Sequence, residues 1–194
     1  SHSVVVLNVG GMIDTEWIKK NPKIDGALLA WQAGMEGGLA IADILCGDVN
    51  PSGKLTDTIA KDYSSYPCAN PFGAKEYNNY TEDIYVGYRY FDKAKKAVQY
   101  PFGHGLSYTK FEKSFVSAEG TDDGFTFKYK VKNVGDCNGA LAIQVYVEKP
   151  CGVLGNPCRE LAGFSKTKTL LPGEEKEYTV IMGITESAEP LANL

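Results

Sequence analysis

The hydrophobic pattern of this 194-residue chain changes its period near Thr109, and that change constrains the fold more than any other feature. Before Thr109, continuous apolar runs alternate with segments of helix-like spacing. After it, apolar and polar residues alternate with a period of two, which is typical of strands with one buried face. Two periods in one chain predict an α/β region followed by an all-β region.

Two apolar runs in the first third of the chain predict strands. Residues 4–10, VVVLNVG, form a β-branched run, which is typical of a strand covered on both faces. Residues 27–31, ALLAW, predict a second buried strand. Helix signals follow each run, so the region is predicted to contain a parallel sheet, and its two strand–helix units correspond to the end of a domain.

The helix signals are capping residues and apolar spacing. Asp14 and Thr15 offer N-cap oxygens for a short helix that continues through residues 17–18. Residues 40–45 have helical apolar spacing, and Gly47 stands where a left-handed C′ residue belongs. Residues 60–99 are rich in Tyr, Asn, Pro and Gly without a period, which predicts a long functional or contacting loop region.

In four segments after Thr109, apolar and polar residues alternate as they do in half-buried antiparallel strands. Pro172 and Gly173 between two of them suit the central pair of a type II turn. Short strands at regular spacing predict a β-sandwich, although four or five strands are fewer than the seven that such a sandwich has. The inward residues are predicted to be Phe125, Phe127, Tyr129 and Val131, then Leu141, Ile143, Val145 and Val147, then Tyr178, Val180 and Met182.

Composition excludes several classes of protein. The chain is 43% hydrophobic and 23% charged with a net charge of −4, so it can bury a core and does not have the basic patches of a nucleic-acid-binding protein. No apolar run reaches the length that spans a bilayer, and no N-terminal signal pattern is present. We therefore expect no nucleic-acid or membrane partner.

The chain contains five cysteines, which is an odd number, and their spacing is irregular. Because no Cys-x-x-Cys pair occurs, a disulfide framework or zinc site is not predicted. Free thiols in a reducing compartment are the favoured interpretation, which predicts a cytoplasmic location with secretion as the alternative. Cys151 and Cys158 flank one loop and form the pair to check for a bridge.

Several segments, taken in order, resemble glycoside hydrolase family 3, the family of β-glucosidases and β-xylosidases. The resemblance extends over residues 4–182, nearly the whole chain. The matching strings are VVVLNVGG, AWQAGMEGGLAIADILCGDVNPSGKL, YTEDIYVGYRYFD, YPFGHGLSYTKF, VKNVGDCNGALAIQVYVEKP and RELAGFSKTKTLLPGEEKEYTV.

The resemblance implies a barrel domain, an α/β sandwich and a fibronectin type III-like domain in a complete enzyme. Residues 1–99 would be the terminal part of the parallel α/β sandwich, and residues 110–194 a fibronectin type III-like β-sandwich, complete or not. Residues 100–109, YPFGHGLSYT, would be an interdomain seam, in which aromatic residues supply buried area and Gly103 and Gly105 allow a sharp turn.

The family also implies a retaining mechanism, in which two carboxylates about 5 to 5.5 Å apart flank the scissile bond. The nucleophile is an Asp in a Ser-Asp-Trp-like context on the barrel, which this sequence lacks. The acid/base is a Glu on a sandwich loop upstream of the strand equivalent to residues 4–10. We therefore expect no catalytic residue in this chain, no cofactor and no metal, and its substrate-binding residues are unknown.

Four features resemble sites and have structural interpretations that we favour. The sequence Glu119-Gly120-Thr121-Asp122 resembles an acid/base motif but lacks its Arg and is predicted to be a polar turn. Glu36 is predicted in the first turn of a helix, with substrate contact as the alternative. The glycine pair at 10–11 does not have the spacing of a phosphate-binding loop. His104 is predicted to be a hydrogen-bonded residue of the seam.

The motif IYVGYRYFD leaves two interpretations open. Its aromatic and planar side chains could line a sugar cleft, or Arg89 could hold the loop while the tyrosines pack between domains. We favour the structural role. The residues concerned are Tyr85, Tyr88, Arg89, Tyr90 and Asp92.

The prediction for function is a segment of a retaining β-glycosidase, with a β-glucosidase acting on terminal non-reducing β-D-glucosyl residues as the favoured activity. The barrel and the remaining sandwich would be present in cis or as a companion chain, and the β-glucoside or oligosaccharide would bind in the intact enzyme. The alternative is a non-catalytic fibronectin-like module that binds carbohydrate or protein. Sugar specificity, the position of the barrel and the oligomeric state stay open. Residues 183–194 depart from the family pattern.

Overall fold

The structure is a computed structural model that describes residues 2–69, 73–122, 124–148, 150 and 155–183. Its residues group into two compact units. The first unit contains residues 1–49 and 55–104, and the second contains residues 50–54 and 105–194. The stretch 100–109 is thus divided between the units after His104. Its role as a seam stays a prediction.

The first unit contains the predicted parallel pair of strands. Strand β1 (Val4–Leu7) pairs with β2 (Gly26–Leu29) in parallel register, and helix α1 (Glu16–Lys20) connects them. The prediction that the first strand is covered on both faces is wrong for the described part of the chain. The side chains of Val4 and Val6 lie on the same face of the strand and are 49% and 36% exposed, so the described residues leave that face largely uncovered.

Helix α1 begins at the predicted position, but only one of the two predicted oxygens caps it. The carboxylate of Asp14 accepts the main-chain N–H of Glu16 at 2.8 Å, whereas Thr15, the N-cap residue, makes no side-chain capping bond. The predicted second helix is α2 (Gly37–Cys46). It ends at Gly47, whose φ of +88° is the left-handed conformation expected at that position.

The region expected to be loops contains short elements. Strands β3 (Ile59–Ala60) and β4 (Val98–Tyr100) pair in antiparallel register, and a 3₁₀ helix, η1 (Tyr63–Ser65), follows β3. Helix α3 (Tyr88–Ala94) was not predicted, because its aromatic residues favour strands and loops over helices. The helix starts after Gly87 and ends at Lys95 in the left-handed conformation.

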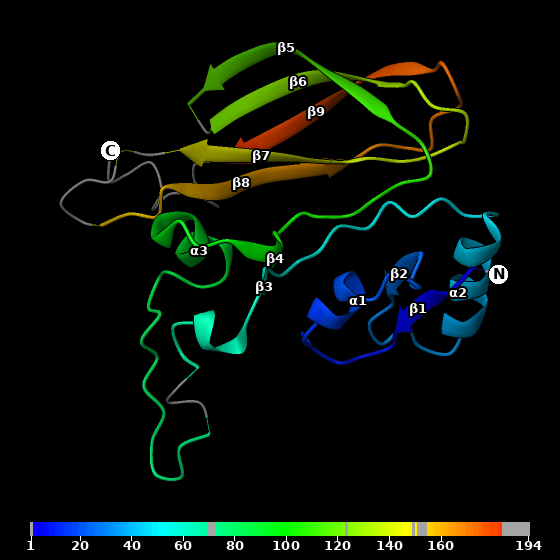
Figure 1. Ribbon diagram of the computed structural model, residues 1–194. Helices are drawn as coiled ribbons and strands as arrows, with labels where there is room; N and C mark the ends of the chain where they lie inside the picture. The colour runs from blue at the N-terminus through cyan, green and yellow to red at the C-terminus, as the bar shows by residue number, and fades with distance from the viewer. Residues whose placement is uncertain (1, 70–72, 123, 149, 151–154, 184–194) are drawn as a thin grey trace. The chain divides into compact units, whose positions relative to one another are not determined.

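Five strands of the second unit form a sheet of three and a sheet of two among its described residues. Strands β5 (Phe111–Thr121), β6 (Gly124–Asn133) and β9 (Glu175–Gly183) make the larger sheet, and β7 (Ala142–Glu148) and β8 (Arg159–Lys166) make the smaller one, all antiparallel (Figure 1). This arrangement agrees with the predicted β-sandwich and with its strand count.

The core of the second unit joins both sheets. The larger sheet supplies Val131 and Val180, the smaller supplies Ile143 and Val145, and Leu170 comes from the connection between β8 and β9. These five side chains are 8% exposed or less, and the alternation predicted all of them except Leu170. The prediction that Phe125 faces inward is wrong, because this side chain, at the start of β6, is 38% exposed. Burial of each contributes roughly 1.5 to 3 kcal/mol relative to exposure.

The predicted type II turn is also confirmed. Gly173 has a φ of +79°, which such a turn requires at its third residue, and the N–H of Glu174 donates to the carbonyl of Leu171 at 3.0 Å. The turn also bonds to the end of β6, because the N–H of Gly173 donates to the carbonyl of Asn133 at 2.8 Å and the N–H of Asn133 donates to the carbonyl of Glu174 at 2.9 Å.

Candidate functional site

Glu36 lies in the loop before α2 and caps the helix without a side-chain hydrogen bond. It is therefore the N-cap residue and not a residue of the first turn, which corrects the prediction by one position. The next residue, Gly37, is buried, and a Cβ there would lie 2.8 Å from the Cβ of Ala33. Close backbone packing at this corner favours a structural role for the Gly-rich sequence.

The aromatic motif at 85–92 makes contacts inside the first unit. Arg89 donates from Nη1 to the carbonyl of Ile84 at 3.2 Å, a bond that holds the loop before α3. The ring of Tyr88 lies 4.9 Å from that of Phe102. Lys96 donates to the hydroxyl of Tyr90 at 2.7 Å. These contacts support the structural interpretation over a sugar cleft.

Lysine side chains cover further tyrosine rings in this unit. Lys93 lies 4.0 Å from the ring centroid of Tyr85 and bonds its hydroxyl. Lys19 lies 4.4 Å from the centroid of Tyr100 and donates to the carbonyl of Gln99 at 2.9 Å, which joins α1 to β4. A ring covered by an ammonium group on one face does not present that face to a sugar.

His104 packs its ring against Tyr100, with centroids 5.0 Å apart. Its carbonyl accepts the N–H of Leu55 at 2.8 Å, and its N–H donates to Pro101 at 3.1 Å. The prediction that Tyr108 is buried is wrong, because this side chain is 50% exposed. Tyr108 belongs to the second unit, where its main-chain N–H donates to the amide oxygen of Asn50.

Gly103 has the conformation predicted for a sharp turn, whereas Gly105 is required by a close approach of two segments of backbone. Gly103 has a φ of +79°. Gly105 faces the carbonyl of Gly53 so closely that a Cβ would lie 2.5 Å from the oxygen. Either position would resist a larger residue.

The segment Glu119-Gly120-Thr121-Asp122, which resembles an acid/base motif, is part of a hairpin. Glu119 lies near the end of β5 and forms an ion pair with Lys128 on β6 at 3.3 Å, and the hydroxyl of Thr121 donates to the carbonyl of Gly124 at 3.2 Å. The predicted polar turn is thus shorter than expected, because Glu119, Gly120 and Thr121 end β5 and only Asp122 lies in the turn. Gly10 likewise serves packing, since a Cβ there would lie 3.2 Å from the amide nitrogen of Gln32.

No described carboxyl group with a clearly altered pKa is suited to act as a general acid. A general acid of a glycosidase needs a raised pKa. Two described carboxyl groups depart clearly from their ordinary pKa, and both are lowered: that of Asp62 by hydrogen bonds from Ser64, and that of Glu174 first by its bond to Lys176. The described residues also include no cluster of three or more His, Cys, Asp or Glu that could hold a metal.

A cavity of about 270 Å³ opens between the two sheets of the second unit. Its lining contains no carboxylate, so it does not have the paired acids that cleave a glycosidic bond. The residues that line it are Lys113, Phe115, Tyr129, Val131, Ile143 and Gln144.

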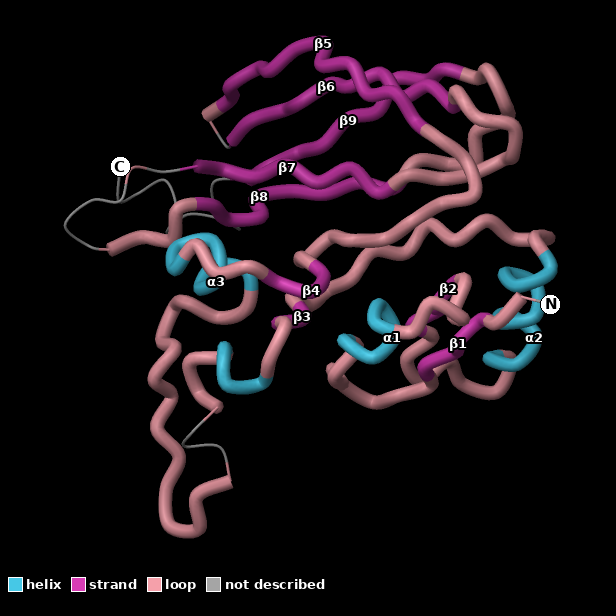
Figure 2. Tube along the Cα trace, in the orientation of Figure 1, coloured by secondary structure: helices cyan, strands magenta, loops and turns pink. Residues whose placement is uncertain are grey.

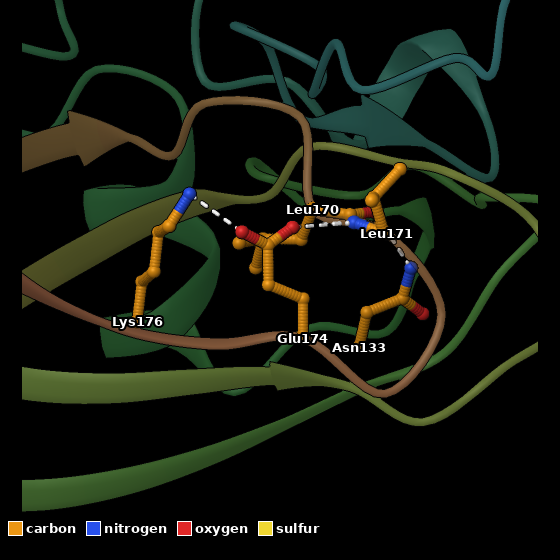
Figure 3. Close-up of polar contacts among 5 residues, drawn as sticks. All are labelled: Asn133, Leu170, Leu171, Glu174 and Lys176. Atoms are coloured by element: carbon orange, nitrogen blue, oxygen red, sulfur yellow. Dashed lines mark hydrogen bonds and ion pairs between the residues drawn. The ribbon is translucent and has the colours of Figure 1, made fainter.

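A polar network around Asn133 is the most connected feature of the second unit, and the sequence analysis missed it. Asn133 is 0% exposed, and its amide nitrogen donates to the carbonyl of Cys137 at 2.8 Å. It also donates to the carbonyl of Leu170 at 2.9 Å (Figure 3). Its amide oxygen accepts from the hydroxyl of Thr109 at 2.6 Å and the N–H of Gly135 at 3.2 Å. All four hydrogen-bonding positions of this buried amide are therefore satisfied.

Asn50 makes a second network from the segment 50–54. Its amide oxygen accepts from the hydroxyl of Ser107 and the N–H of Tyr108, each at 2.9 Å, and its nitrogen donates to the carbonyl of Asn138 at 2.8 Å. Lys54 bonds the carbonyl of Gly105, and burial, then the nearby charge of Lys113, lowers its pKa. The turn that follows α2 is thereby held in the second unit.

Of the cysteines, Cys46, Cys68 and Cys137 are free. Cys151 lies outside the described residues, so the pair with Cys158 stays an open prediction. Residues 184–194 of the segment that departs from the family pattern also lie outside them. No described helix is long and apolar enough to cross a membrane.

Comparison with known proteins identifies both units. The model of the glycosyl hydrolase family 3 C-terminal domain matches residues 1–108, and that of a fibronectin type III-like domain matches residues 142–185. The chain is 44% identical to β-glucosidase A of Butyrivibrio fibrisolvens, over 97% of this chain and 25% of that protein. It is 49% identical to a β-glucosidase of Ruminococcus albus, over 93% of this chain and 19% of that protein.

Solved structures agree with these matches. A β-glucosidase from Paenibacillus barengoltzii superposes with a TM-score of 0.88 at 44% identity, over 96% of this chain and 21% of that one. β-Glucosidase 3B of Thermotoga neapolitana, in complex with glucose, superposes with a TM-score of 0.85 at 39% identity, over 93% of this chain and 26% of that one. The chain thus spans about a fifth to a quarter of the length of these proteins.

Proposed function

Because the chain belongs to glycoside hydrolase family 3, with a C-terminal domain and a fibronectin type III-like domain of that family, we propose that it is the non-catalytic section of a retaining β-glucosidase. The whole protein would hydrolyse terminal, non-reducing β-D-glucosyl residues. The observation that carries this proposal is the match of over 90% of the chain to proteins named β-glucosidases, at only 19 to 25% of their length.

The exposed apolar surface of the first unit supports a partner in the same protein. A two-stranded sheet is marginal by itself, and β1 exposes Val4 and Val6. Helix α2 exposes Leu39 and Leu45, which are 65% and 46% accessible. Further strands and helices of the family's sandwich, in cis or in a companion chain, would cover these side chains.

The catalytic carboxylates would then belong to the other parts of the protein. A fluorinated β-glucoside that traps the glycosyl-enzyme intermediate tests this in the whole protein, followed by peptide mapping of the labelled carboxylate. The proposal predicts a label outside residues 1–194. A label on an Asp or Glu of this chain would contradict it.

A non-catalytic binding module is the second candidate, and the exposed aromatic residue Phe164 is the observation in its favour. This side chain is 76% exposed on β8, and aromatic faces can stack on sugars. Calorimetry of the chain with cello-oligosaccharides separates the two functions. A binding module must show affinity by itself, whereas the section of an enzyme proposed above should show none.

A cytoplasmic location also stays a proposal. Its support is the free state of Cys46, Cys68 and Cys137, two of which are exposed. Fractionation of the source cells tests it, with activity in the culture medium as the contrary result.

A further inference from the structure

The dipeptide Asn138-Gly139, in the connection between β6 and β7, is the pair in this chain most prone to deamidation. It is the one place in the sequence where Asn precedes Gly. In such a pair the main-chain nitrogen of the glycine can attack the side-chain Cγ of the asparagine, because glycine has no side chain to hinder the approach. Asn138 is exposed, so water has access to its side chain.

The reaction exchanges one bond for another and then consumes water. The nitrogen of Gly139 forms a bond to Cγ of Asn138, the Cγ–Nδ2 bond breaks, and ammonia leaves with the proton that Gly139 loses. Water then opens the resulting succinimide ring at either of its carbonyl groups, which gives aspartate or isoaspartate at position 138. Isoaspartate adds a methylene to the main chain, so it would displace Gly139 from its bridge with Leu170.

Both polar groups of the peptide unit between Asn138 and Gly139 are hydrogen-bonded in the structure. The carbonyl of Asn138 accepts from Nδ2 of Asn50 at 2.8 Å. The N–H of Gly139 donates to the carbonyl of Leu170 at 3.1 Å, and the N–H of Leu170 donates back to the carbonyl of Gly139 at 2.8 Å. The nitrogen that must lose its hydrogen and turn toward Cγ is therefore fixed in a two-way bridge.

The packing around position 139 explains why a glycine is present there. A Cβ would lie 2.8 Å from both Nδ2 of Asn50 and Cγ2 of Thr109, and 3.1 Å from the ring of Phe111. Close packing thus requires the residue that makes the preceding asparagine reactive. The same close approach brings the amide of Asn50 to the carbonyl that it bonds.

We propose that Asn138 is a latent deamidation site, which the hydrogen bonds with Asn50 and Leu170 keep closed in the folded protein. Deamidation then requires local opening of this connection, as hydrogen exchange at the Gly139 amide does. Because two or three hydrogen bonds must open first, the reaction should be roughly ten- to a hundredfold slower than in an unfolded chain. The inference does not depend on the proposed function, since it concerns residues of the second unit alone.

Peptide mapping by mass spectrometry measures the reaction. The whole protein is incubated at mildly alkaline pH with its thiols reduced, beside the synthetic peptide VGDCNGALA, which has the sequence of residues 134–142. Methylation by an isoaspartyl methyltransferase scores isoaspartate at position 138. We expect conversion in the protein to be slower than in the peptide by the factor above, and exchange of the Gly139 amide to be slowed by a similar factor. Conversion at the rate of the peptide would overturn the proposal. So would a slow reaction at Asn138 beside a freely exchanging Gly139 amide.

Two variants in one turn isolate the bond from Asn50. Asn50→Asp keeps an oxygen that accepts from Ser107 and Tyr108, but it replaces the donor to Asn138 with a second oxygen. Ser52→Ala lies in the same turn and is no part of this bond. Deamidation should be severalfold faster in Asn50→Asp and unchanged in Ser52→Ala. An unchanged rate in Asn50→Asp, or an equal increase in both variants, would overturn the proposal. If hydrogen exchange in β9 shows that Asn50→Asp unfolds the second unit, the comparison with the peptide decides.

Discussion

The side-chain amide of Asn133 donates to the main-chain carbonyl of Leu170 across 2.9 Å, between two residues that are both 0% exposed. Asn133 ends β6, and Leu170 bridges to Gly139 just before β7 begins. The contact therefore links the end of the three-stranded sheet to both connections of the two-stranded sheet.

Asn133→Ala should weaken the second unit more than any exposed substitution. The change leaves the carbonyls of Cys137 and Leu170 and the hydroxyl of Thr109 without this partner in a dry interior, at a cost of about 3 kcal/mol. Hydrogen exchange at the amides of Gly139 and Leu170 should accelerate accordingly. Asn138→Ala is the control, since Asn138 is exposed, and an equal effect there would contradict the account.

Asn50→Ala should loosen the segment 50–54 without unfolding the strands. It removes acceptors for Ser107 and Tyr108 and a donor for Asn138, for a loss of about 1 to 2 kcal/mol. The measurement is hydrogen exchange at the Tyr108 amide, compared with that at Val180 in β9. Ser52→Ala, in the same turn, is the matched control. Unchanged exchange at Tyr108 would show that the network does not hold this segment.

Tyr66→Phe should destabilise the first unit. The hydroxyl of Tyr66 accepts from the N–H of Ala60 and donates to the carbonyl of Thr58, each at 3.0 Å, and burial raises its pKa. Loss of both bonds at a half-buried site costs about 1 to 2 kcal/mol. Tyr63→Phe is the control, because Tyr63 begins the 3₁₀ helix that ends just before Tyr66 and is 60% exposed. Thermal unfolding midpoints of the whole protein compare the two, and equal midpoints would refute the prediction.

Glu174 should make the Leu171–Glu174 turn sensitive to acid. Its carboxylate bonds Lys176 at 2.5 Å and accepts the N–H of Leu171 at 2.8 Å, and the bond to Lys176 is the main cause of its lowered pKa. Because the folded pKa lies below the ordinary value of 4.5, the stabilisation is present above pH 4.5 and is lost as pH falls through the lowered value.

An NMR titration of the Leu171 amide checks this. Its chemical shift should follow the carboxylate with a midpoint below 4.5, and Glu174→Gln should abolish the transition. A midpoint at or above 4.5 would mean that the ion pair does not form in solution.

Sequence pattern predicted the features that depend on neighbouring residues. The left-handed Gly47, the turn at Pro172–Gly173 and the inward face of β7 follow from backbone conformation and period alone. Helix α3 was missed because its aromatic residues have weak helix propensity, and tertiary contacts such as Tyr88 on Phe102 stabilise it.

The polar networks could not be predicted for a different reason. In the sequence, Asn50 belongs to Asn-Pro-Ser-Gly, an ordinary turn, and its partners lie 57 to 88 residues away. Asn133 stands at the end of an alternating strand where an asparagine would ordinarily be exposed. Only the packing of distant segments brings these amides, Asn133 buried and Asn50 half-buried, against their partners. The exposure of Val4 likewise depends on which elements pack over that face of β1.

The proposed absence of a catalytic pair from residues 1–194 is tested most directly by the release of nitrophenol from p-nitrophenyl β-glucoside. The isolated chain and the whole protein are assayed side by side at equal molar concentration, with circular dichroism to confirm that the chain is folded. The account predicts hydrolysis by the whole protein and a rate equal to that of buffer for the folded chain. Turnover by the chain alone would contradict it.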